Sequence, residues 1–293
     1  MTTSPTDLGI LVGIDGSPEA HAALRWATEE AVLRQCPITL MHVVAPIVVT
    51  WPIESVVMSF TEWQEENAKH VIEQARETVR GSVDAASAPP VHVRLRHDGI
   101  VPELTEASAS ARIMVIGSRG LGPVGGVVLG AVSRTLLHHA RCPVVVAKEG
   151  VVRKSDRSRP VLLGIDGSPA SEAAIAFAFD EASRRGVDLI ALHAWSDVAV
   201  FPLLGMDWHK YEQEGHEILA ERLAGWQEKY PDVHVSRRIV CDRPARWLID
   251  EAKDAQLVVV GSRGRGGIAG MLLGSVSTAV AESAMAPVAV IRS

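Results

Sequence analysis

The hydrophobic residues of the chain fall into short runs that are separated by longer amphipathic segments. In the first half, segments of strand length that are rich in apolar residues cover residues 8–14, 38–44, 91–95, 112–117 and 143–147. Between these runs the apolar residues recur at helical spacing, which predicts helices over residues 18–35, 61–83, 102–110 and 132–140. Strands that alternate with helices are typical of an α/β fold.

The second half of the chain repeats the first. The segment VGIDGSP at Val12 reappears as LGIDGSP at Leu163, and VIGSRG at Val115 reappears as VVGSRG at Val259. Between the copies, residues 150–159 are polar and rich in Arg and Lys, as in an exposed linker. We therefore expect two domains, residues 1–149 and 160–293, joined by this linker. The strands of the second domain are expected near Val161, Leu189, Val233, Leu257 and Val288.

Some of the apolar runs contain no polar position. Residues 113–116 read Ile-Met-Val-Ile, and residues 257–260 read Leu-Val-Val-Val. Such strands must be covered on both faces, as in a doubly wound parallel sheet between two layers of helices. Ligands of these sheets bind at the carboxyl ends of the strands. The first strand ends at Asp15 and the fourth at Gly117, so the two loops that follow are the predicted location of a site.

Glycines with a fixed spacing follow the fourth strand of each copy. In the second copy Gly261 and Gly264 are separated by two residues, and Gly274 follows after nine more. Such a loop can direct backbone N–H groups at an anion, and the helix beginning near Val276 adds its positive N-terminal end. A simple turn would explain one such loop, but two loops with identical spacing favour a phosphate site. The glycines of the first copy are Gly117, Gly120 and Gly130.

Other phosphate-binding motifs are weak or missing. Residues 120–125 match GxGxxG, but they follow the fourth strand, no helix follows them directly, and the second copy does not repeat them. A P-loop needs Gly-Lys-Ser or Gly-Lys-Thr, and the chain contains neither.

The side chains of the two glycine loops differ. The first copy has Ala131 in place of Ser275 and Leu121 in place of Arg265. We therefore expect the second site to bind an anion more tightly than the first, because a charge-assisted contact adds affinity. The hydroxyl and cationic groups expected to act at the second site are those of Ser275, Ser277, Arg263 and Arg265.

The combined pattern resembles the ATP-binding class of universal stress proteins. It consists of the glycine spacing, an aspartate at the end of the first strand and a His-Val pair, His42 and Val43, at the end of the second. The resemblance covers nearly the whole chain and implies strand order 3-2-1-4-5, with ATP across the top of each sheet. It assigns the adenine side to Asp15 and Asp166, with backbone contacts at Val43 and Ala194. The expected ATP-binding residues of the first domain are Gly13, Asp15, Val43, Gly117, Ser118, Arg119, Gly120, Gly130, Ala131, Val132 and Ser133. Those of the second domain are Gly164, Asp166, Ala194, Gly261, Ser262, Arg263, Gly264, Arg265, Gly274, Ser275, Val276 and Ser277.

Several recurring residues also have a purely structural interpretation. Asp15 and Asp166 suit an Asx-turn or a helix cap, but their position at a strand end favours nucleotide contact. His42 and His193 lack a recurring Ser or Cys partner, so a structural role is favoured over a catalytic one. The seven tryptophans do not pair between the copies and are expected to pack in the core or between subunits.

Composition excludes several classes of protein. The 29 Lys and Arg against 35 Asp and Glu give a net charge of −6, so we expect no nucleic-acid binding. The most apolar stretch, residues 41–58, is interrupted by Pro46, Pro52 and Glu54, and a spanning helix needs about 20 apolar residues, so we expect no membrane insertion. The three cysteines form no CxxC pair, which predicts neither a disulfide framework nor a zinc site. No basic residue precedes the apolar segment 8–14, as a signal peptide would require, because Arg25 is the first. A cytoplasmic protein is therefore expected.

The loops carry little of what phosphoryl transfer requires. Each predicted site has one repeated aspartate and no second repeated carboxylate for Mg²⁺, so we expect no catalytic residues and no metal site of the protein's own.

The expected function is a stress-response regulator that binds ATP, with or without Mg²⁺, and acts on a regulatory protein partner. The alternatives are slow ATP hydrolysis, autophosphorylation or adenylyl transfer, and a structural module with an empty anion-binding loop. We also expect a homodimer, and the resemblance implies a pseudo-dimer joined through strands 143–147 and 287–291.

Overall fold

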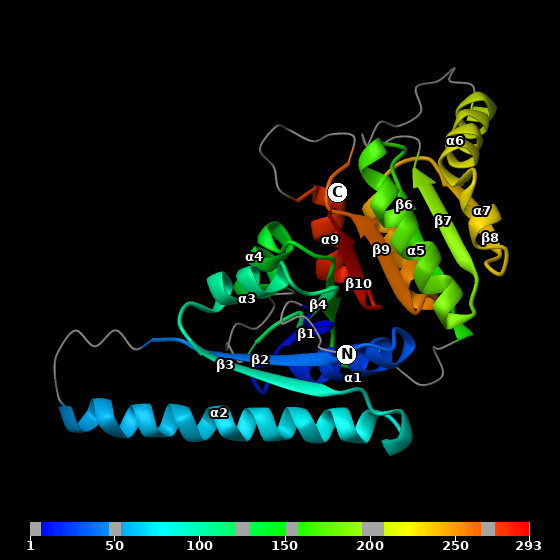
Figure 1. Ribbon diagram of the computed structural model, residues 1–293. Helices are drawn as coiled ribbons and strands as arrows, with labels where there is room; N and C mark the ends of the chain where they lie inside the picture. The colour runs from blue at the N-terminus through cyan, green and yellow to red at the C-terminus, as the bar shows by residue number, and fades with distance from the viewer. Residues whose placement is uncertain are drawn as a thin grey trace. The chain divides into compact units, whose positions relative to one another are not determined.

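The computed structural model divides the chain into two units, Met1–Glu149 and Gly150–Ser293 (Figure 1). The structure describes residues 7–46, 54–120, 129–150, 158–194, 208–264 and 273–292. Each unit alternates strands with helices, which confirms the predicted α/β class.

A five-stranded parallel sheet forms the centre of the first unit. Its order is β3-β2-β1-β4-β5, as the family resemblance implied. The register places Ile10 of β1 beside Ile38 of β2 and Ile113 of β4, and all three side chains are buried. The strands are β1 (Ile10–Gly13), β2 (Ile38–Val44), β3 (Val91–His97), β4 (Ile113–Gly117) and β5 (Val144–Ala147).

Helices cover both faces of this sheet. The first two helices pack against each other on one face, and the last two pack against each other on the opposite face (Figure 1). This double covering explains why β2 and β4 are apolar and buried at nearly every position. The helices are α1 (Pro18–Leu33), α2 (Glu54–Ser82), α3 (Ile100–Ser108) and α4 (Ala131–His139), with a short 3₁₀ helix η1 (Ala85–Ser87).

The second unit repeats this architecture. Its parallel sheet has the order β8-β7-β6-β9-β10, which is again 3-2-1-4-5 in the numbering of one copy. The strands are β6 (Val161–Ile165), β7 (Leu189–Ala194), β8 (Val235–Val240), β9 (Leu257–Gly261) and β10 (Val288–Ile291). The helices are α5 (Glu172–Arg185), α6 (Trp208–Leu223), α7 (Trp226–Lys229), α8 (Pro244–Glu251) and α9 (Ser275–Ser283), with 3₁₀ helices η3 (Pro169–Ser171) and η4 (Ala252–Asp254).

The first helix begins differently in the two units. In α1 the Ser17 side chain caps the helix by accepting a hydrogen bond from the N–H of Ala20 (3.2 Å). Ser168 makes no such cap, and the chain passes through η3 before α5 begins at Glu172.

The second helix differs from the sequence prediction, because α2 begins at Glu54 rather than at residue 61. The predicted pairing of the two fifth strands stays a prediction.

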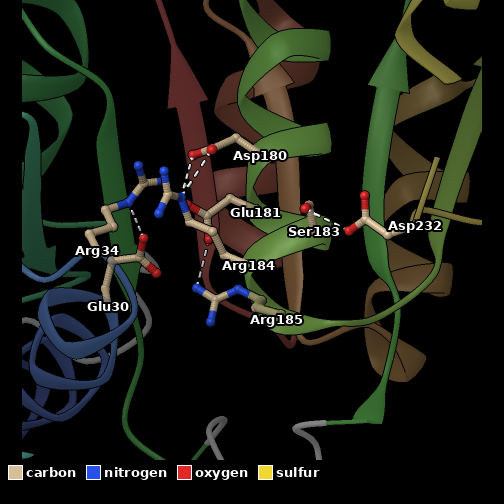
Figure 2. Close-up of polar contacts among 8 residues, drawn as sticks. All are labelled: Glu30, Arg34, Asp180, Glu181, Ser183, Arg184, Arg185 and Asp232. Atoms are coloured by element: carbon tan, nitrogen blue, oxygen red, sulfur yellow. Dashed lines mark hydrogen bonds and ion pairs between the residues drawn. The ribbon is translucent and has the colours of Figure 1, made fainter. Parts of the chain in front are cut away.

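Ion pairs recur near the C-terminal ends of α1 and α5. Arg34 pairs with Glu30 on α1, and Arg185 pairs with Glu181 on α5 at 2.7 Å (Figure 2). Both carboxylates are buried, where an ionised group requires such a partner. In the second unit Ser183 of α5 also donates a hydrogen bond to Asp232 in the segment before β8 (2.7 Å, Figure 2).

The described tryptophans differ in their environments. Trp26 is buried in α1, which supports the predicted core role. Trp226 is half-buried and stacks on the buried Phe179 with 5.8 Å between the ring centroids. Trp63 and Trp247 are exposed. Trp51 and Trp195, and the side chain of Trp208, lie outside the described residues.

None of the helices described is both long and apolar enough to cross a membrane.

Candidate functional site

An Asx-turn follows the first strand of each unit. In the first unit, Asp15 Oδ1 accepts hydrogen bonds from the Ser17 N–H (2.9 Å) and the Ser17 hydroxyl (2.6 Å). Gly16 between them has φ +83°, which an L side chain rarely adopts. Asp166, Gly167 and Ser168 form the same turn in the second unit, with distances of 2.9 and 2.8 Å. The structural interpretation of these aspartates is therefore correct for one carboxylate oxygen, Oδ1.

The other carboxylate oxygen faces the glycine loop. A Cβ atom on Gly120 would lie 2.6 Å from Asp15 Oδ2, and one on Gly264 would lie 2.9 Å from Asp166 Oδ2. The second glycine of each loop therefore packs directly on the aspartate. Asp166 Oδ2 is shielded from solvent and accepts no hydrogen bond from any residue that the structure describes. A buried oxygen without a donor suits a ligand that brings one.

Hydrogen bonds hold each loop against the helix that follows it. The N–H of Gly130 donates to the Ser118 carbonyl (2.7 Å), and that of Gly274 donates to the Ser262 carbonyl (2.8 Å). The loops are also tied to the fifth strands, because the N–H groups of Ser118 and Ser262 donate to Ala147 (2.9 Å) and Ile291 (2.7 Å). The described start and end of each loop are thus tied to each other and to the sheet.

Two serines predicted to meet phosphate already have partners inside the protein. The Ser133 hydroxyl donates to the Gly117 carbonyl (2.8 Å), and the Ser277 hydroxyl donates to the Gly261 carbonyl (2.6 Å). Both side chains are buried. These hydroxyls brace the loop, and their contact with a ligand stays a prediction. Sequence analysis found the residues through their repetition but missed this role.

The helices that follow the loops begin where the glycine spacing placed them. Helix α4 begins at Ala131 and α9 at Ser275, after Gly130 and Gly274, neither of which supplies a capping side chain. The N–H groups of a first helical turn lack acceptors within the helix and carry its positive dipole end. Ala131 and Ser275 are both exposed, so each helix start is accessible.

The loop arginines have different surroundings. Arg119 donates two hydrogen bonds to Glu19 Oε1, from Nε (2.9 Å) and Nη2 (2.6 Å). The corresponding Arg263 of the second unit is exposed, and Ala170 occupies the position of Glu19. Sequence analysis missed Glu19, although its replacement in the second copy was visible. Arg265 and Leu121, on which the predicted difference in affinity partly rested, lie outside the described residues.

Histidines on the second strand support the Asx-turns. Nδ1 of His42 lies 2.7 Å from the carbonyl oxygen of Ile14, and Nδ1 of His193 lies 2.7 Å from that of Ile165. Since a carbonyl only accepts, Nδ1 carries the hydrogen in both rings. Each bond fixes the backbone directly before Asp15 or Asp166. These hydrogen bonds support the predicted structural role of the histidines.

The remaining predicted residues lie near these loops. Val43 and Ala194 follow the two histidines at the ends of β2 and β7. Gly13 and Gly164 lie in β1 and β6, and a Cβ at either position would meet Leu104 at 3.5 Å or Leu248 at 3.0 Å. Gly164 therefore lets α8 approach β6 closely, whereas a Cβ at Gly13 would make an ordinary van der Waals contact with α3.

Comparison with known proteins identifies the type of domain. The sequence model of the universal stress protein family matches residues 9–148 and 157–292. The chain belongs to this family. A universal stress protein of Mycolicibacterium smegmatis is 54% identical over 292 residues, which cover all of this chain and 99% of that protein. One from Mycobacterium tuberculosis is 49% identical over 293 residues, with the same coverage.

A solved universal stress protein shares the fold of this family member. The crystal structure of a universal stress protein from Archaeoglobus fulgidus superposes with a TM-score of 0.70 at 22% identity, covering 98% of each chain. The family and the α/β fold that the sequence pattern predicted are thus confirmed.

Metal ligands and reactive thiols are not prominent among the described residues of this universal stress protein. No described group of three or more His, Cys, Asp or Glu side chains could hold a metal ion. Burial raises the pKa of Cys142 to about 12 and also raises the pKa of Cys36. Desolvation raises the pKa of Cys241 as well. Thiols with raised pKa values are poor nucleophiles, which does not favour redox sensing.

Proposed function

We propose that the chain is a regulator that binds ATP in each of its two units, with little or no turnover. The observation that carries this proposal is the meeting of three elements in each unit. An aspartate at the end of the first strand packs against the second glycine of the loop after the fourth strand, and a backbone hydrogen bond ties this loop to an uncapped helix N-terminus. Such a helix end attracts phosphate.

The polarity of the residues present fits an adenine nucleotide. Asp166 Oδ2, buried without a donor, would accept a hydrogen bond from the nucleoside side of the ligand. The backbones at Val43 and Ala194 would face the adenine, and the N–H groups of the loops and of the first turns of α4 and α9 would face the phosphates. Bound ATP would supply negative charge that neutralises the two helix ends.

The arrangement of charged groups supports binding rather than catalysis. Transfer of a phosphoryl group needs metal ligands and a group that orients the nucleophile. In each described loop the aspartate is fixed by an Asx-turn, and both strand-two histidines are engaged with a backbone carbonyl. Mg²⁺, where present, would therefore enter with the nucleotide phosphates. The regulatory outcome would be a conformational or partner-binding state that depends on occupancy.

Identification of bound nucleotide tests this proposal directly. The purified chain is denatured and any released nucleotide is identified by chromatography and mass, and the stripped protein is then titrated with ATP in a calorimeter. We expect adenine nucleotide in the released fraction and saturable binding by the stripped protein. Absence of both would leave only the structural-module alternative.

Turnover separates the regulator from the enzymatic alternatives. We expect no release of phosphate or pyrophosphate above the rate of an Asp15→Ala, Asp166→Ala double variant. Hydrolysis that the double variant abolishes would favour a slow ATPase.

The cytoplasmic location, the homodimer and the protein partner are separate proposals. Light scattering of the full chain with and without ATP tests the dimer.

A further inference from the structure

An ion pair distinguishes the glycine loop of the first unit. Arg119 lies in the loop, and both its Nε and Nη2 donate to Glu19 Oε1. The Glu19 side chain is only 8% exposed, whereas that of Arg119 is 51% exposed. The carboxylate is therefore a fixed and largely desolvated group, and the arginine is the accessible partner.

Packing explains why Glu19 cannot easily leave this position. It lies in the first turn of α1, where the helix dipole stabilises a negative charge. A Cβ on Gly117 would lie 2.8 Å from both the backbone carbon and the Cβ of Glu19. The start of α1 is thus in direct contact with the first glycine of the loop, and the carboxylate is held beside the loop that would receive phosphate.

The second unit lacks this negative charge. Ala170 stands at the position of Glu19, and the corresponding Arg263 is exposed. The first glycine also has more space, because a Cβ on Gly261 would lie 3.9 Å from the Ala170 carbonyl oxygen and 3.2 Å from that of Arg263. Arg263 is consequently available to an anion, because Ala170 supplies no carboxylate where Glu19 supplies one in the first unit.

We propose that Glu19 is a specificity-determining residue that makes the first unit favour adenylates with fewer phosphates, whereas the second unit favours ATP. This inference rests on the proposed nucleotide function. A triphosphate that recruited Arg119 would leave the desolvated Glu19 carboxylate without its partner and beside a like charge. A monophosphate places less negative charge near the loop and leaves the ion pair intact. The two units would then respond to different adenylates.

Each site can be read separately in the full-length chain. Asp166→Ala disables the second site, and in this background Glu19→Gln removes the charge while keeping the size of the side chain. We expect Glu19→Gln to strengthen ATP binding about tenfold, the size of one charge-assisted contact, and to change AMP binding much less. Glu19→Ala, which copies Ala170, should act in the same direction. Glu77→Gln on α2 is the matched control, because it removes the same charge from an exposed side chain and should leave both affinities unchanged.

The reciprocal exchange installs the carboxylate in the second unit. In an Asp15→Ala background, Ala170→Glu should weaken ATP binding about tenfold relative to AMP binding. Calorimetric titrations with ATP and with AMP measure both ratios, and circular dichroism melts confirm that each variant is folded. Unchanged ATP-to-AMP ratios in folded variants that still bind would overturn the role of Glu19 and leave the proposed function intact. A wild-type chain that binds neither nucleotide would overturn both.

Discussion

The glycine loops of the two units are built alike at the aspartate and differently at the first helix. Both have the same Asx-turn, the same approach of the second glycine to Oδ2 and the same serine hydroxyl on the loop carbonyl. By contrast, Glu19 and a capped helix stand in the first unit where Ala170 and a 3₁₀ helix stand in the second. The duplicated chain has thus kept the backbone geometry of the loop and changed the charge next to it.

This difference separates two kinds of constraint. The aspartate and the second glycine are in contact, so neither position can change without moving the other. At position 19 or 170 the backbone packs near the first loop glycine in both units, and the side chain beyond Cβ differs, so substitution there changes the charge beside the loop. Conservation of shape and divergence of charge between copies is the arrangement expected if the two sites bind related ligands of different charge.

The largest expected effect comes from the shared contact. Gly120→Ala and Gly264→Ala would place a Cβ 2.6 or 2.9 Å from Oδ2 of the facing aspartate and force the carboxylate or the loop to shift. We expect each variant to weaken ATP binding at its own site by about tenfold or more, and the double variant to lose measurable binding. Calorimetric titration measures both.

Gly81→Ala on α2 is the matched control for these variants. A Cβ at Gly81 would meet no atom within 4 Å, so ATP binding should be unchanged. The higher helix propensity of alanine should stabilise the fold by up to about 1 kcal/mol. Wild-type affinity in a folded double variant would show that these loops do not bind the nucleotide.

The strand-two histidines provide a second test of what the units share. His42→Leu or His193→Leu would leave the buried carbonyl of Ile14 or Ile165 without its donor, at a cost of about 1 to 3 kcal/mol in unfolding free energy. His42→Asn and His193→Asn keep an N–H donor near the position of Nδ1 and should recover part of the loss. Chemical denaturation checks these values. Equal stability of the Leu and Asn variants would argue against a role for the bond.

The first loop glycine should show the difference between the units. Gly117→Ala meets backbone atoms of Glu19 and Ala20 at 2.8 to 3.0 Å, which cannot move without displacing α1, whereas Gly261→Ala meets its nearest neighbour at 3.2 Å. We expect Gly117→Ala to cost about 1 kcal/mol more unfolding free energy than Gly261→Ala. Both are the first glycine of a loop with the same spacing, so the sequence alone gives no reason for a difference in stability. Equal melting temperatures of the two variants would contradict the packing difference.

Much of the fold followed from the sequence because its signal is local and repeated. Fully apolar runs such as residues 113–116 require cover on both faces, and the duplicated glycine spacing located both loops. The ion pair between Glu19 and Arg119 joins residues 100 positions apart, and no spacing rule predicts such a pair. The 3₁₀ start at Pro169 was also missed, because the Ser-Pro signal is identical in both copies and the local packing decides the outcome. The sequence does contain one clue to a difference at this place, because the second copy has Ala170 where the first has Glu19.

The smallest expected effect concerns a surface pair found in the first unit. Arg112 donates to Asp7 at 2.6 Å, and this hydrogen bond lowers the pKa of the Asp7 carboxyl below its usual value of 3.8. The corresponding positions of the second unit are Ser158 and Gln256, which cannot form an ion pair.

Acid unfolding should therefore reveal a small contribution specific to the first unit. A lowered pKa in the folded state stabilises the fold above the unfolded-state pKa, and this contribution disappears as the pH falls from about 4 through the lower folded-state value. Since both side chains are about half exposed, we expect Asp7→Asn to remove no more than about 1 kcal/mol at pH 7 and nothing near pH 2. Denaturation at several pH values measures the difference, with Asp84→Asn, an exposed carboxylate with no described ion pair, as the control. If Asp7→Asn and Asp84→Asn followed the same pH dependence, the pair would contribute nothing to the stability of the first unit.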